Sequence, residues 1–578
     1  MQNLITEHLD IWTAAHKTRS TAGRGSNNKL DLVGIKKLRE LILELAVRGK
    51  LVPQDSRDEP ASELLKKVSA EKAKLIKEGK IKKEKSLPEI TDEEKPFELP
   101  EKWKYIRLGT GFTLMSGTTF EKERELESGE YLYVKVGDMN LPNNEMEIKT
   151  SSRFVDPFEK EKRSLIPSGS IVFPKRGGAI ATNKKRYVRE EIFVDLNVMA
   201  ITPYTGIILE YAMLWLSGID LALLNSGTSV PQINNKDIEP LLFPLPPLSE
   251  QHRIVAKVDE LMAFCDQLEQ TQSDNIVAHA QLVEALLATL SNSSDHNELQ
   301  NNWQRIAAHF DTLFTTEHSI DQLKQTILQL AVMGKLVPQN PNDEPANELL
   351  KKIATEKAQL IKEGKIKKEK PLPEITDEEK PFELPSGWEW ERFSSVANSR
   401  LGKMLDKAKN SGEMKPYLRN TNVQWGLIEL DDIKEMKLEE SELSEFKLEY
   451  GDLLICEGGY PGRCAIWKHK TIEMYFQKAL HRARAYSGVI SEYLQLCLFN
   501  DLNTGGLDKY ISGATIQHFT GDKLDRYVIP IAPSEEQHRI VTKVDELMAL
   551  CDTLKTNLQN AQTTQLALAD ALVEQAVN

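Results

Sequence analysis

The feature that most constrains this fold is an internal duplication that runs through the chain of 578 residues. Residues 35–103 return as residues 320–388 at an offset of 285, and 51 of the 69 aligned positions are identical. A second block, 244–269, returns as 530–555 at an offset of 286. A fixed period of this kind marks one structural unit that is repeated. We therefore expect a pseudo-two-fold molecule whose two termini lie near one another.

Between the repeated blocks lie two segments of about the same length and almost unrelated sequence. Each alternates short β-type runs with Gly, Asn and Pro turns and contains one apolar helix, which predicts a mixed α/β domain. We refer to them as the first and second variable domains. The predicted order is an N-terminal constant region at 1–103, the first variable domain at 104–243, a central constant region at 244–388, the second variable domain at 389–529 and a C-terminal constant helix at 530–578.

The second repeated block has the apolar spacing of a coiled coil. Apolar residues step by four and three positions from Ile254 to Leu268, and the copy repeats the pattern from Ile540 to Leu554. Prolines precede both stripes, as expected before a helix start. The spacing predicts a helix from about 249 to 290, roughly 60 Å long, and an equivalent helix at the end of the chain.

Composition limits the possible classes of protein. No stretch approaches the 18 uncharged apolar residues of a membrane span, and the acidic, amphipathic N-terminus does not resemble a signal peptide. The chain has five cysteines, none spaced as CxxC, which fits a reducing cytosol without a disulfide framework or zinc site. We therefore expect a cytoplasmic protein that does not enter a membrane.

The sequence carries no convincing catalytic motif. Phosphate-binding, hydrolase and metalloprotease signatures are absent, as is the Asn/Asp/Ser-Pro-Pro-aromatic tetrapeptide of amino-methyltransferases. Asp138, Glu147 and Lys149 have a nuclease-like spacing, but a solvated strand is the more ordinary interpretation in a chain rich in Glu and Lys. We expect no catalytic residue, no metal and no cofactor in this chain.

Positive charge gathers at the same place in both variable domains, although the formal net charge is −13. Residues 160–189 hold nine basic side chains against one acidic one, and 458–486 hold six against one. Both clusters contain glycine-rich turns that allow close approach of backbone to phosphate. A charge run by itself is more typical of a solvated face, but the paired placement favours DNA contact.

Polar turns add a second group of candidates, for which the alternative is hydrogen bonding within turns and at strand edges. Asn, Gln and Arg side chains in such turns suit the reading of base edges. The predicted DNA-binding residues are Lys175, Arg176, Asn183, Lys184, Lys185, Arg186, Thr228, Ser229, Gln232, Asn234, Arg419, Asn420, Asn422, Arg463, Lys468, His469, Arg482, Gln517 and His518.

The blocks LAVRGKLVPQ and LAVMGKLVPQ, the turn SGTSVPQIN and the segment PLPPLSEQHRIVAKVDELMA resemble specificity subunits of type I restriction-modification systems. The resemblance covers essentially the whole chain. It implies two pseudo-two-fold related α/β target-recognition domains joined by long antiparallel coiled-coil helices. It also implies a non-catalytic subunit in which each domain reads one half of a split, asymmetric site on double-stranded DNA. The helices would hold the domains apart.

The resemblance further implies partner proteins. Two methyltransferase subunits, which bind S-adenosylmethionine themselves, would dock on the constant regions, and restriction-translocase subunits would join for cleavage. His252, Arg253, His538 and Arg539, at the start of the two long helices, are the predicted partner-binding residues. The chain departs from the family pattern at residues 1–34.

Two other classes stay open. A self-contained methyltransferase or nuclease would need the motifs that the sequence lacks. A coiled-coil interaction scaffold without DNA specificity would fit the acidic net charge, and it predicts no effect of Lys184→Glu or Arg463→Glu on DNA binding. If the chain reads DNA, its net charge predicts weak binding by the isolated subunit and tight binding once partners complete a positive channel.

Overall fold

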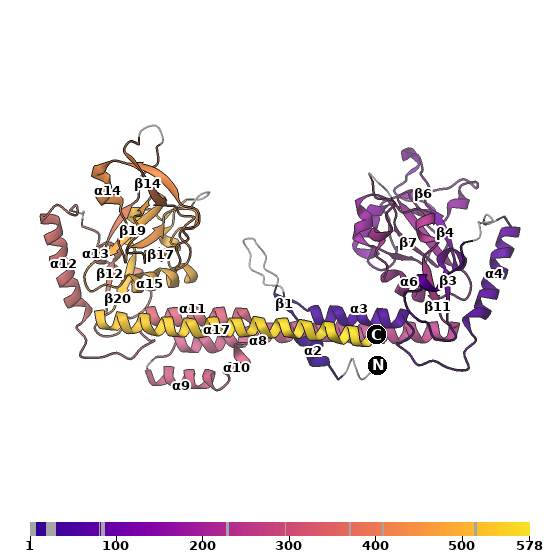
Figure 1. Ribbon diagram of the computed structural model, residues 1–578, viewed down its shortest axis with the longest axis horizontal. Coiled ribbons are helices and arrows are strands. Elements are labelled where there is room, and N and C mark those ends of the chain that lie inside the picture. The colour runs from indigo at the N-terminus through magenta and orange to yellow at the C-terminus, as the bar shows by residue number, and fades with distance from the viewer. Residues whose placement is uncertain are drawn as a thin grey trace. The chain divides into compact units, whose positions relative to one another are not determined.

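The computed structural model describes residues 7–18, 30–79, 81, 87–226, 230–294, 296–368, 371–406, 410–513 and 517–577. The chain forms two compact units. Unit 1 comprises Met1–Asp274 and Ala561–Asn578, and unit 2 comprises Asn275–Asn560. Each unit contains one variable domain and part of both long helices, α8 (Leu248–Ser291) and α17 (Ser534–Val577) (Figure 1). The N-terminal constant region therefore shares a unit with the last turns of the chain.

The constant-region helices α3 (Val33–Val47) and α4 (Ala61–Lys77) are amphipathic and pack through one face. α3 buries Leu38, Leu41, Ile42 and Leu45, whereas α4 buries three residues near its start and exposes a charged surface. α3 ends before Gly49, whose φ is +70° and whose position has no room for a side chain, since an added Cβ would lie 2.6 Å from Pro100. The other elements before the variable domain are α2 (Leu9–Ala14), β1 (Lys17–Thr18) and β2 (Leu30–Asp31).

The two long helices run in opposite directions within unit 1. Contacts along α3 and the residues just after it follow descending residue numbers in α8 and ascending numbers in α17, so this stretch of chain runs antiparallel to α8 and parallel to α17. The pairs are Arg39–Asp266 and Gln54–Glu250 with α8, and Lys37–Asp570 and Lys50–Val577 with α17. Unit 2 repeats the arrangement around α11 (Glu317–Val332), with Lys324–Asp552 and Gln339–Glu536 to α17 and Lys335–Ser291 to α8.

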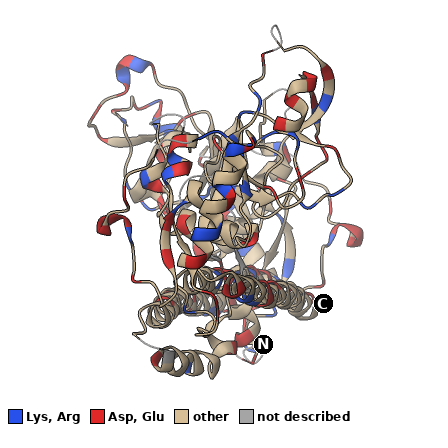
Figure 2. Cartoon of the chain, turned by 90° about the vertical axis from the view of Figure 1, so that its left-hand side faces the viewer, with Lys and Arg blue, Asp and Glu red and all other residues tan. Residues whose placement is uncertain are grey.

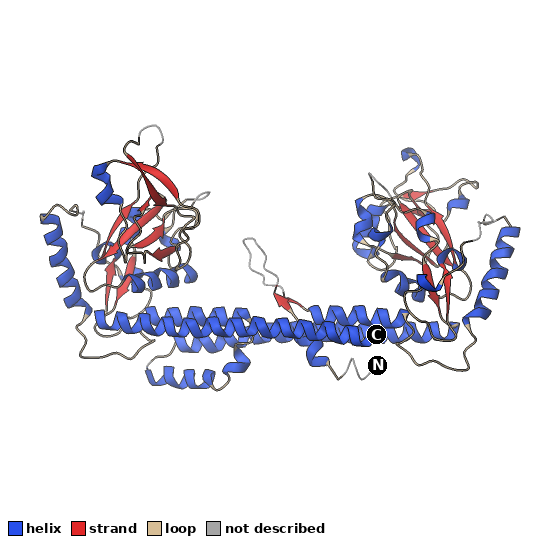
Figure 3. Ribbon diagram, viewed as in Figure 1, coloured by secondary structure: helices blue, strands red, loops and turns tan. Residues whose placement is uncertain are grey.

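The first variable domain is built from three sheets (Figure 3). A four-stranded antiparallel sheet has the order β4-β10-β7-β8, a three-stranded sheet has the order β6-β5-β9, and β11 pairs with β3 where the domain meets α8. The strands are β3 (Lys104–Arg107), β4 (Phe112–Ser116), β5 (Tyr131–Val134), β6 (Phe154–Val155), β7 (Ser170–Pro174), β8 (Arg186–Val188), β9 (Phe193–Val194), β10 (Val198–Pro203) and β11 (Leu242–Leu245). The helices are α5 (Leu108–Gly111), α6 (Leu209–Ser217) and α7 (Asn235–Ile238).

The second variable domain has the same topology. Its sheets have the orders β13-β19-β16-β17, β15-β14-β18 and β12-β20. The strands are β12 (Glu389–Arg392), β13 (Ala397–Leu401), β14 (Glu413–Leu418), β15 (Lys434–Leu438), β16 (Leu453–Cys456), β17 (Cys464–Ile466), β18 (Tyr475–Phe476), β19 (Leu480–Ala485) and β20 (Val528–Ile531). The remaining helices of unit 2 are α9 (His296–Ala307), α10 (Phe310–Leu313), α12 (Ala346–Lys362), α13 (Phe393–Val396), α14 (Glu440–Phe446), α15 (Ser491–Thr504) and α16 (Gly521–Arg526).

The cores lie where the apolar patterns predict them. β7 and β16 are buried along their whole length, as expected for central strands. The seam of α8 buries Ile254, Val258, Leu261 and Cys265, and all five cysteines are buried and free. The predicted fold class, mixed α/β with two related domains and long antiparallel helices, is confirmed.

Candidate nucleic-acid interface

In the first variable domain, the basic loop connects two neighbouring strands of the four-stranded sheet. It leaves β7 at Lys175, passes through a short 3-10 helix (Gly178–Thr182) and enters β8 at Arg186. Gly177 has a φ of +78°, which allows the chain to turn sharply after the strand. Arg176 is exposed on this loop. Arg176 follows the buried strand β7 by two residues, so the position of its backbone is fixed by the sheet.

The polar turn that was predicted separately packs against this loop. Arg176 and Gln232 form an isolated antiparallel bridge, and the Arg176 guanidinium donates to Gln232 Oε1 at 3.1 Å. The Ile233 N–H donates to the Lys175 carbonyl at 2.8 Å. Gln232 Nε2 in turn donates to Asn234 Oδ1 at 2.7 Å. The two candidate sets therefore form one continuous polar surface.

Lys175 and Lys184 lie half-buried at the rim of this surface. Lys175 Nζ donates to Ser116 Oγ at 2.7 Å, and desolvation lowers the pKa of Lys175. Lys184 Nζ donates to Asn140 Oδ1. Both acceptors are neutral, so neither hydrogen bond brings a negative charge to the lysine ammonium. The predicted contacts Thr228 and Ser229 lie outside the described residues.

Three other predicted DNA contacts are engaged inside the first domain. Lys185 is buried, where its ammonium donates to Asn183 Oδ1 at 2.8 Å and to the Ile219 carbonyl at 2.7 Å, and desolvation lowers its pKa to about 8. Asn183 itself takes the left-handed conformation at φ +53° and ends the 3-10 helix. Arg186 donates to backbone carbonyls, including that of Asn144. We propose that these side chains shape the loop rather than contact DNA.

The equivalent loop of the second domain connects β16 to β17 and carries different chemistry. Gly458 and His518 form an isolated bridge at the place where Arg176 forms one in the first domain. Glu457 stands where the first domain has Lys175, and His518 Nδ1 lies 3.1 Å from both of its carboxylate oxygens. The neighbouring residue, Gln517, is exposed. The same backbone frame thus presents a carboxylate in place of the Lys175 ammonium, no side chain in place of Arg176, and an imidazole in place of the Gln232 amide.

Arg463 closes this second loop from inside. Its guanidinium donates to the Asn420 carbonyl at 2.7 Å and to Gln424 Oε1 at 3.1 Å. Asn420 Nδ2 donates in turn to the Gly458 carbonyl at 3.1 Å. Because its hydrogen bonds are made within the domain, we propose that Arg463 organises the surface and does not itself reach DNA.

Three more predicted contacts of the second domain, Arg419, Asn422 and Arg482, also make contacts inside the domain. Asn422 is buried and its Nδ2 donates to the Glu429 carbonyl at 3.1 Å. The Arg419 guanidinium forms an ion pair of 2.5 Å with Asp432. Arg482 is buried on β19, where desolvation lowers its pKa to about 10. We propose supporting roles for all three.

Lys468 and His469 lie at the opposite end of β17 from this loop. β17 ends at Ile466, and both residues follow it, whereas Arg463 precedes the strand. Lys468 is exposed, and the His469 ring lies 4.8 Å from that of Trp467. The structure therefore separates these two predicted contacts from Asn420, Arg463 and His518.

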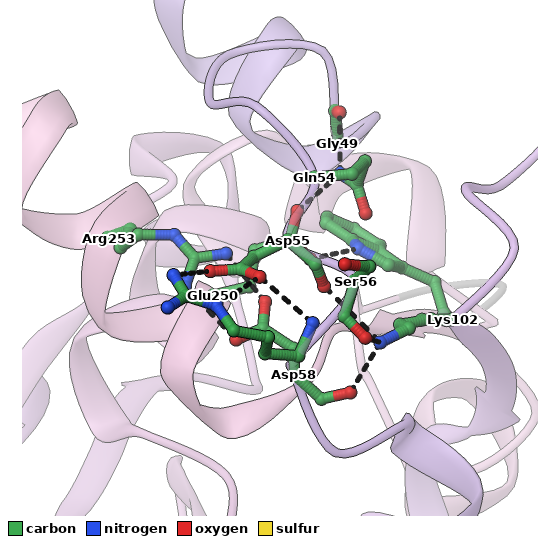
Figure 4. A network of polar contacts seen from close by, with 10 residues as sticks. Gly49, Gln54, Asp55, Ser56, Asp58, Lys102, Glu250 and Arg253 are labelled. Carbon is green, nitrogen blue, oxygen red and sulfur yellow. Dashed lines mark hydrogen bonds and ion pairs between the residues drawn. The ribbon is translucent and has the colours of Figure 1, made fainter.

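The repeated EQHR motif at the start of α8 fixes the helix to the domain and the constant region (Figure 4). The buried Glu250 accepts hydrogen bonds from Trp103 Nε1 at 2.9 Å and from Gln54 Nε2 at 2.5 Å, and desolvation raises its pKa. Gln251, also buried, accepts from the Ile208 N–H at 2.8 Å. We call this set of contacts, together with the copy described next, the clasp.

The second copy of the clasp has the same contacts. Glu536 accepts from Trp388 Nε1 at 3.1 Å and from Gln339 Nε2 at 2.7 Å, and desolvation raises its pKa. Gln537 accepts from the Ile490 N–H at 3.1 Å. These Glu and Gln residues were not among the predicted site residues, although their recurrence beside His252 and His538 was a signal for them.

The predicted partner-binding set divides in two. Arg253 pairs with Asp58 at 2.6 Å, and Arg539 pairs with Asp343 at the same distance, so both arginines bind within their own units. His252 and His538 are exposed at equivalent positions beside them. The histidines are the members of this set that remain open to a partner.

Charges of both signs are interspersed over the side of the chain shown in Figure 2. Many of them form local pairs on the helices, such as Lys351–Glu348 and Lys543–Glu546. Exposed pairs of this kind add little stability and leave little net field. Within the described parts of the chain, no helix is both long and apolar enough to cross a membrane, and no group of three or more His, Cys, Asp or Glu side chains is placed to hold a metal ion.

Comparison with known proteins identifies relatives along the whole chain. The model of the type I restriction modification DNA specificity domain matches residues 100–278 and 385–562. The specificity subunits of the type I restriction enzymes EcoAI and EcoEI from Escherichia coli are 42 % and 40 % identical, and each match covers 100 % of both chains. The crystal structure of the HsdS subunit from Thermoanaerobacter tengcongensis aligns with 83 % of this chain and 98 % of its own, at 17 % identity and a TM-score of 0.42.

Proposed function

Because this chain belongs to the family of type I restriction-modification specificity subunits, we propose that it reads a split, asymmetric DNA site with one variable domain on each half. DNA recognition for a restriction-modification system is the function of the family. We propose in addition that the two variable domains divide the recognition of DNA between them. In this proposal the two variable domains are the target-recognition domains.

The observation that carries the proposal is a shared frame with different surfaces. Both domains have the same strand orders and hold the same loop against the same polar turn. The first loop and turn offer Lys175, Arg176 and Gln232, whereas the second loop and turn offer Glu457, Gly458 and His518 at the equivalent places. Base edges are recognised by complementary donors and acceptors, so loops of different chemistry select different bases. This difference supports an asymmetric site.

The long helices support a fixed spacing between the two halves of the site. α8 and α17 each contribute to both units, with the division falling after Asp274 in one and after Asn560 in the other. A helix rises about 1.5 Å per residue and resists stretching, so its length is a well-defined ruler. In this proposal the bases between the half-sites are spanned without being read.

The duplicated clasp supports two copies of one partner. Its contacts recur in both units, and His252 and His538 are exposed at equivalent positions. Equivalent surfaces bind equivalent subunits. We assign them to two methyltransferase subunits, which hold S-adenosylmethionine themselves, with restriction-translocase subunits joining the assembly for cleavage.

Methylation mapping tests the proposal. The chain is co-expressed with the methyltransferase subunit of its own system in a host without adenine methylation, and methylated adenines are mapped across the genome. The expected result is two unequal half-sites separated by a fixed number of unspecified bases. An unmethylated genome or a single uninterrupted motif would overturn the proposal. Methylation by the purified chain with S-adenosylmethionine alone would instead indicate an enzyme.

A further inference from the structure

The loop between β16 and β17 holds a large aromatic side chain in solvent. Tyr460 lies just beyond the end of β16 and is 68 % exposed. The equivalent position in the first variable domain is Gly178, which has no side chain. Burying an aromatic ring removes a large apolar area from water, so an exposed ring that has other exposed apolar side chains beside it points to a contact surface.

A buried guanidinium supports the Tyr460 ring from below. Arg463 lies 4.7 Å from the ring centroid and is itself 9 % exposed. Its hydrogen bonds to Asn420 and Gln424 hold it in place. Gly459 has a φ of +84°, and a side chain there would clash with Asn420 at 2.6 Å. These contacts hold the loop backbone and place the Tyr460 ring over the Arg463 guanidinium.

Two further apolar side chains adjoin this loop. Gln424, which binds Arg463, begins a turn that exposes 44 % of Trp425 and 59 % of Leu427. The Gly426 N–H donates to the Cys464 carbonyl at 3.1 Å, which fixes this turn beside the start of β17. Arg463 links this turn to the Tyr460 loop, and the Gly458–His518 bridge joins that loop to the His518 turn. We call Tyr460, Trp425 and Leu427 the apolar patch.

We propose that Tyr460 inserts at a base step of the second half-site and reads it by stacking, with Trp425 and Leu427 flanking the opened step. This inference rests on the proposed function. The patch is continuous with the loop and turn that correspond to the Arg176 surface, which identifies DNA as its occupant. Aromatic wedges open base steps in this manner, and flexible pyrimidine–purine steps yield most readily. The two half-sites are therefore read differently, one by cations and one by an aromatic wedge.

Fluorescence of 2-aminopurine in the second half-site measures base unstacking directly. The complex with methyltransferase subunits is titrated onto duplexes labelled at successive positions, leaving out the target adenine, because methyltransferases flip that base themselves. We expect a rise in fluorescence at one step. Tyr460→Ala should abolish it and weaken binding about tenfold, whereas Tyr460→Phe should keep both.

Tyr450 provides a matched control within the same strand pair. It is 57 % exposed and Lys470 lies 4.7 Å from its ring centroid, but it precedes β16 and so lies at the opposite end of the strand. Tyr450→Ala should leave the fluorescence rise and the affinity unchanged. An absence of any rise, or a rise that survives Tyr460→Ala, would overturn the inference.

The methyltransferase subunits provide a second check. If Tyr460→Ala releases them from the complex in size-exclusion chromatography, the patch is a protein interface and the inference is wrong. Failure of the proposed function is distinguishable, because it would leave the wild-type complex without a split methylation motif. Failure of this inference leaves that motif intact and removes the dependence on Tyr460.

Discussion

At the scale of single residues, the buried carboxylates of the clasp are the most demanding feature of the chain. Glu250 and Glu536 lie in the interior, where an unpaired charge is costly. Each is retained because two donors point at its oxygens, one from a tryptophan and one from a glutamine. These hydrogen bonds tie the start of each long helix to the constant region beside it.

Removing one of these donors should destabilise the unit without altering the DNA site. Trp103→Phe keeps an aromatic ring but removes the indole N–H that Glu250 Oε2 accepts, and it also shrinks a buried side chain. We expect a loss of about 1–3 kcal/mol in the free energy of unfolding, measured by urea denaturation. Trp388→Phe is the matched change in unit 2 and should cost a similar amount. Losses below about 0.5 kcal/mol for both would show that the clasp is not a stabilising contact.

Exposure separates side chains that can read DNA from those that shape the loop. Arg176→Ala should relax the first half-site, because a guanidinium that contacts guanine gives about 1–3 kcal/mol of discrimination. Lys185→Met should instead lower stability, since it removes two buried hydrogen bonds. Methylation mapping checks the effect of Arg176→Ala on the motif, and thermal unfolding checks the effect of Lys185→Met on stability. The reverse pattern, with Lys185 setting the motif, would contradict the assignment.

This separation could not be predicted from the sequence. The basic run in the first domain includes Lys175 and Arg176, and the structure brings both beside the separately predicted Gln232, whereas their contact with DNA stays a prediction. The basic runs could not indicate orientation, since a charge run says nothing about which side chains point inward. Lys185 and Arg482 belong to runs that predict DNA contact, yet both side chains are buried.

At the scale of elements, the periodic apolar patterns predicted where a helix and several strands would form. They did not predict which strands would pair. The predicted helix at about 249–290 is α8, Leu248–Ser291. The β-type runs became β5, β7, β16 and β17. The order β4-β10-β7-β8 was not predicted, because strands distant in sequence pair through contacts that no local pattern encodes.

The long helices give a prediction at the same scale. Inserting one heptad into α8 after Asp274 and another into α17 after Asn560 keeps both coiled-coil stripes in phase. Seven residues add about 10 Å, or about three base pairs at 3.4 Å each. Methylation mapping should then give the same half-sites with about three more unspecified bases between them. An unchanged gap would exclude the helices as the ruler.

At the scale of the whole molecule, the chain contains two copies of one architecture, and their variable domains carry different surfaces. The duplication predicted the repeated topology, and the net charge of −13 is an average over acidic constant segments and basic loops. The constant parts recur contact by contact, from Lys50–Val577 in unit 1 to Lys335–Ser291 in unit 2. Apart from residues 1–34 and 286–319, which do not repeat, the difference between the units therefore lies in their variable domains.

Replacing residues 389–529 by a second copy of residues 104–243 tests this account most directly. The clasp and the flanking constant segments are nearly identical in both units, so the transplanted domain meets the same framework. Co-expressed with the methyltransferase subunit, this chain should methylate a palindrome made of the first half-site and its inverted copy at the original spacing. A motif that stays asymmetric, or that keeps the second half-site, would contradict the claim that each variable domain reads one half of the site.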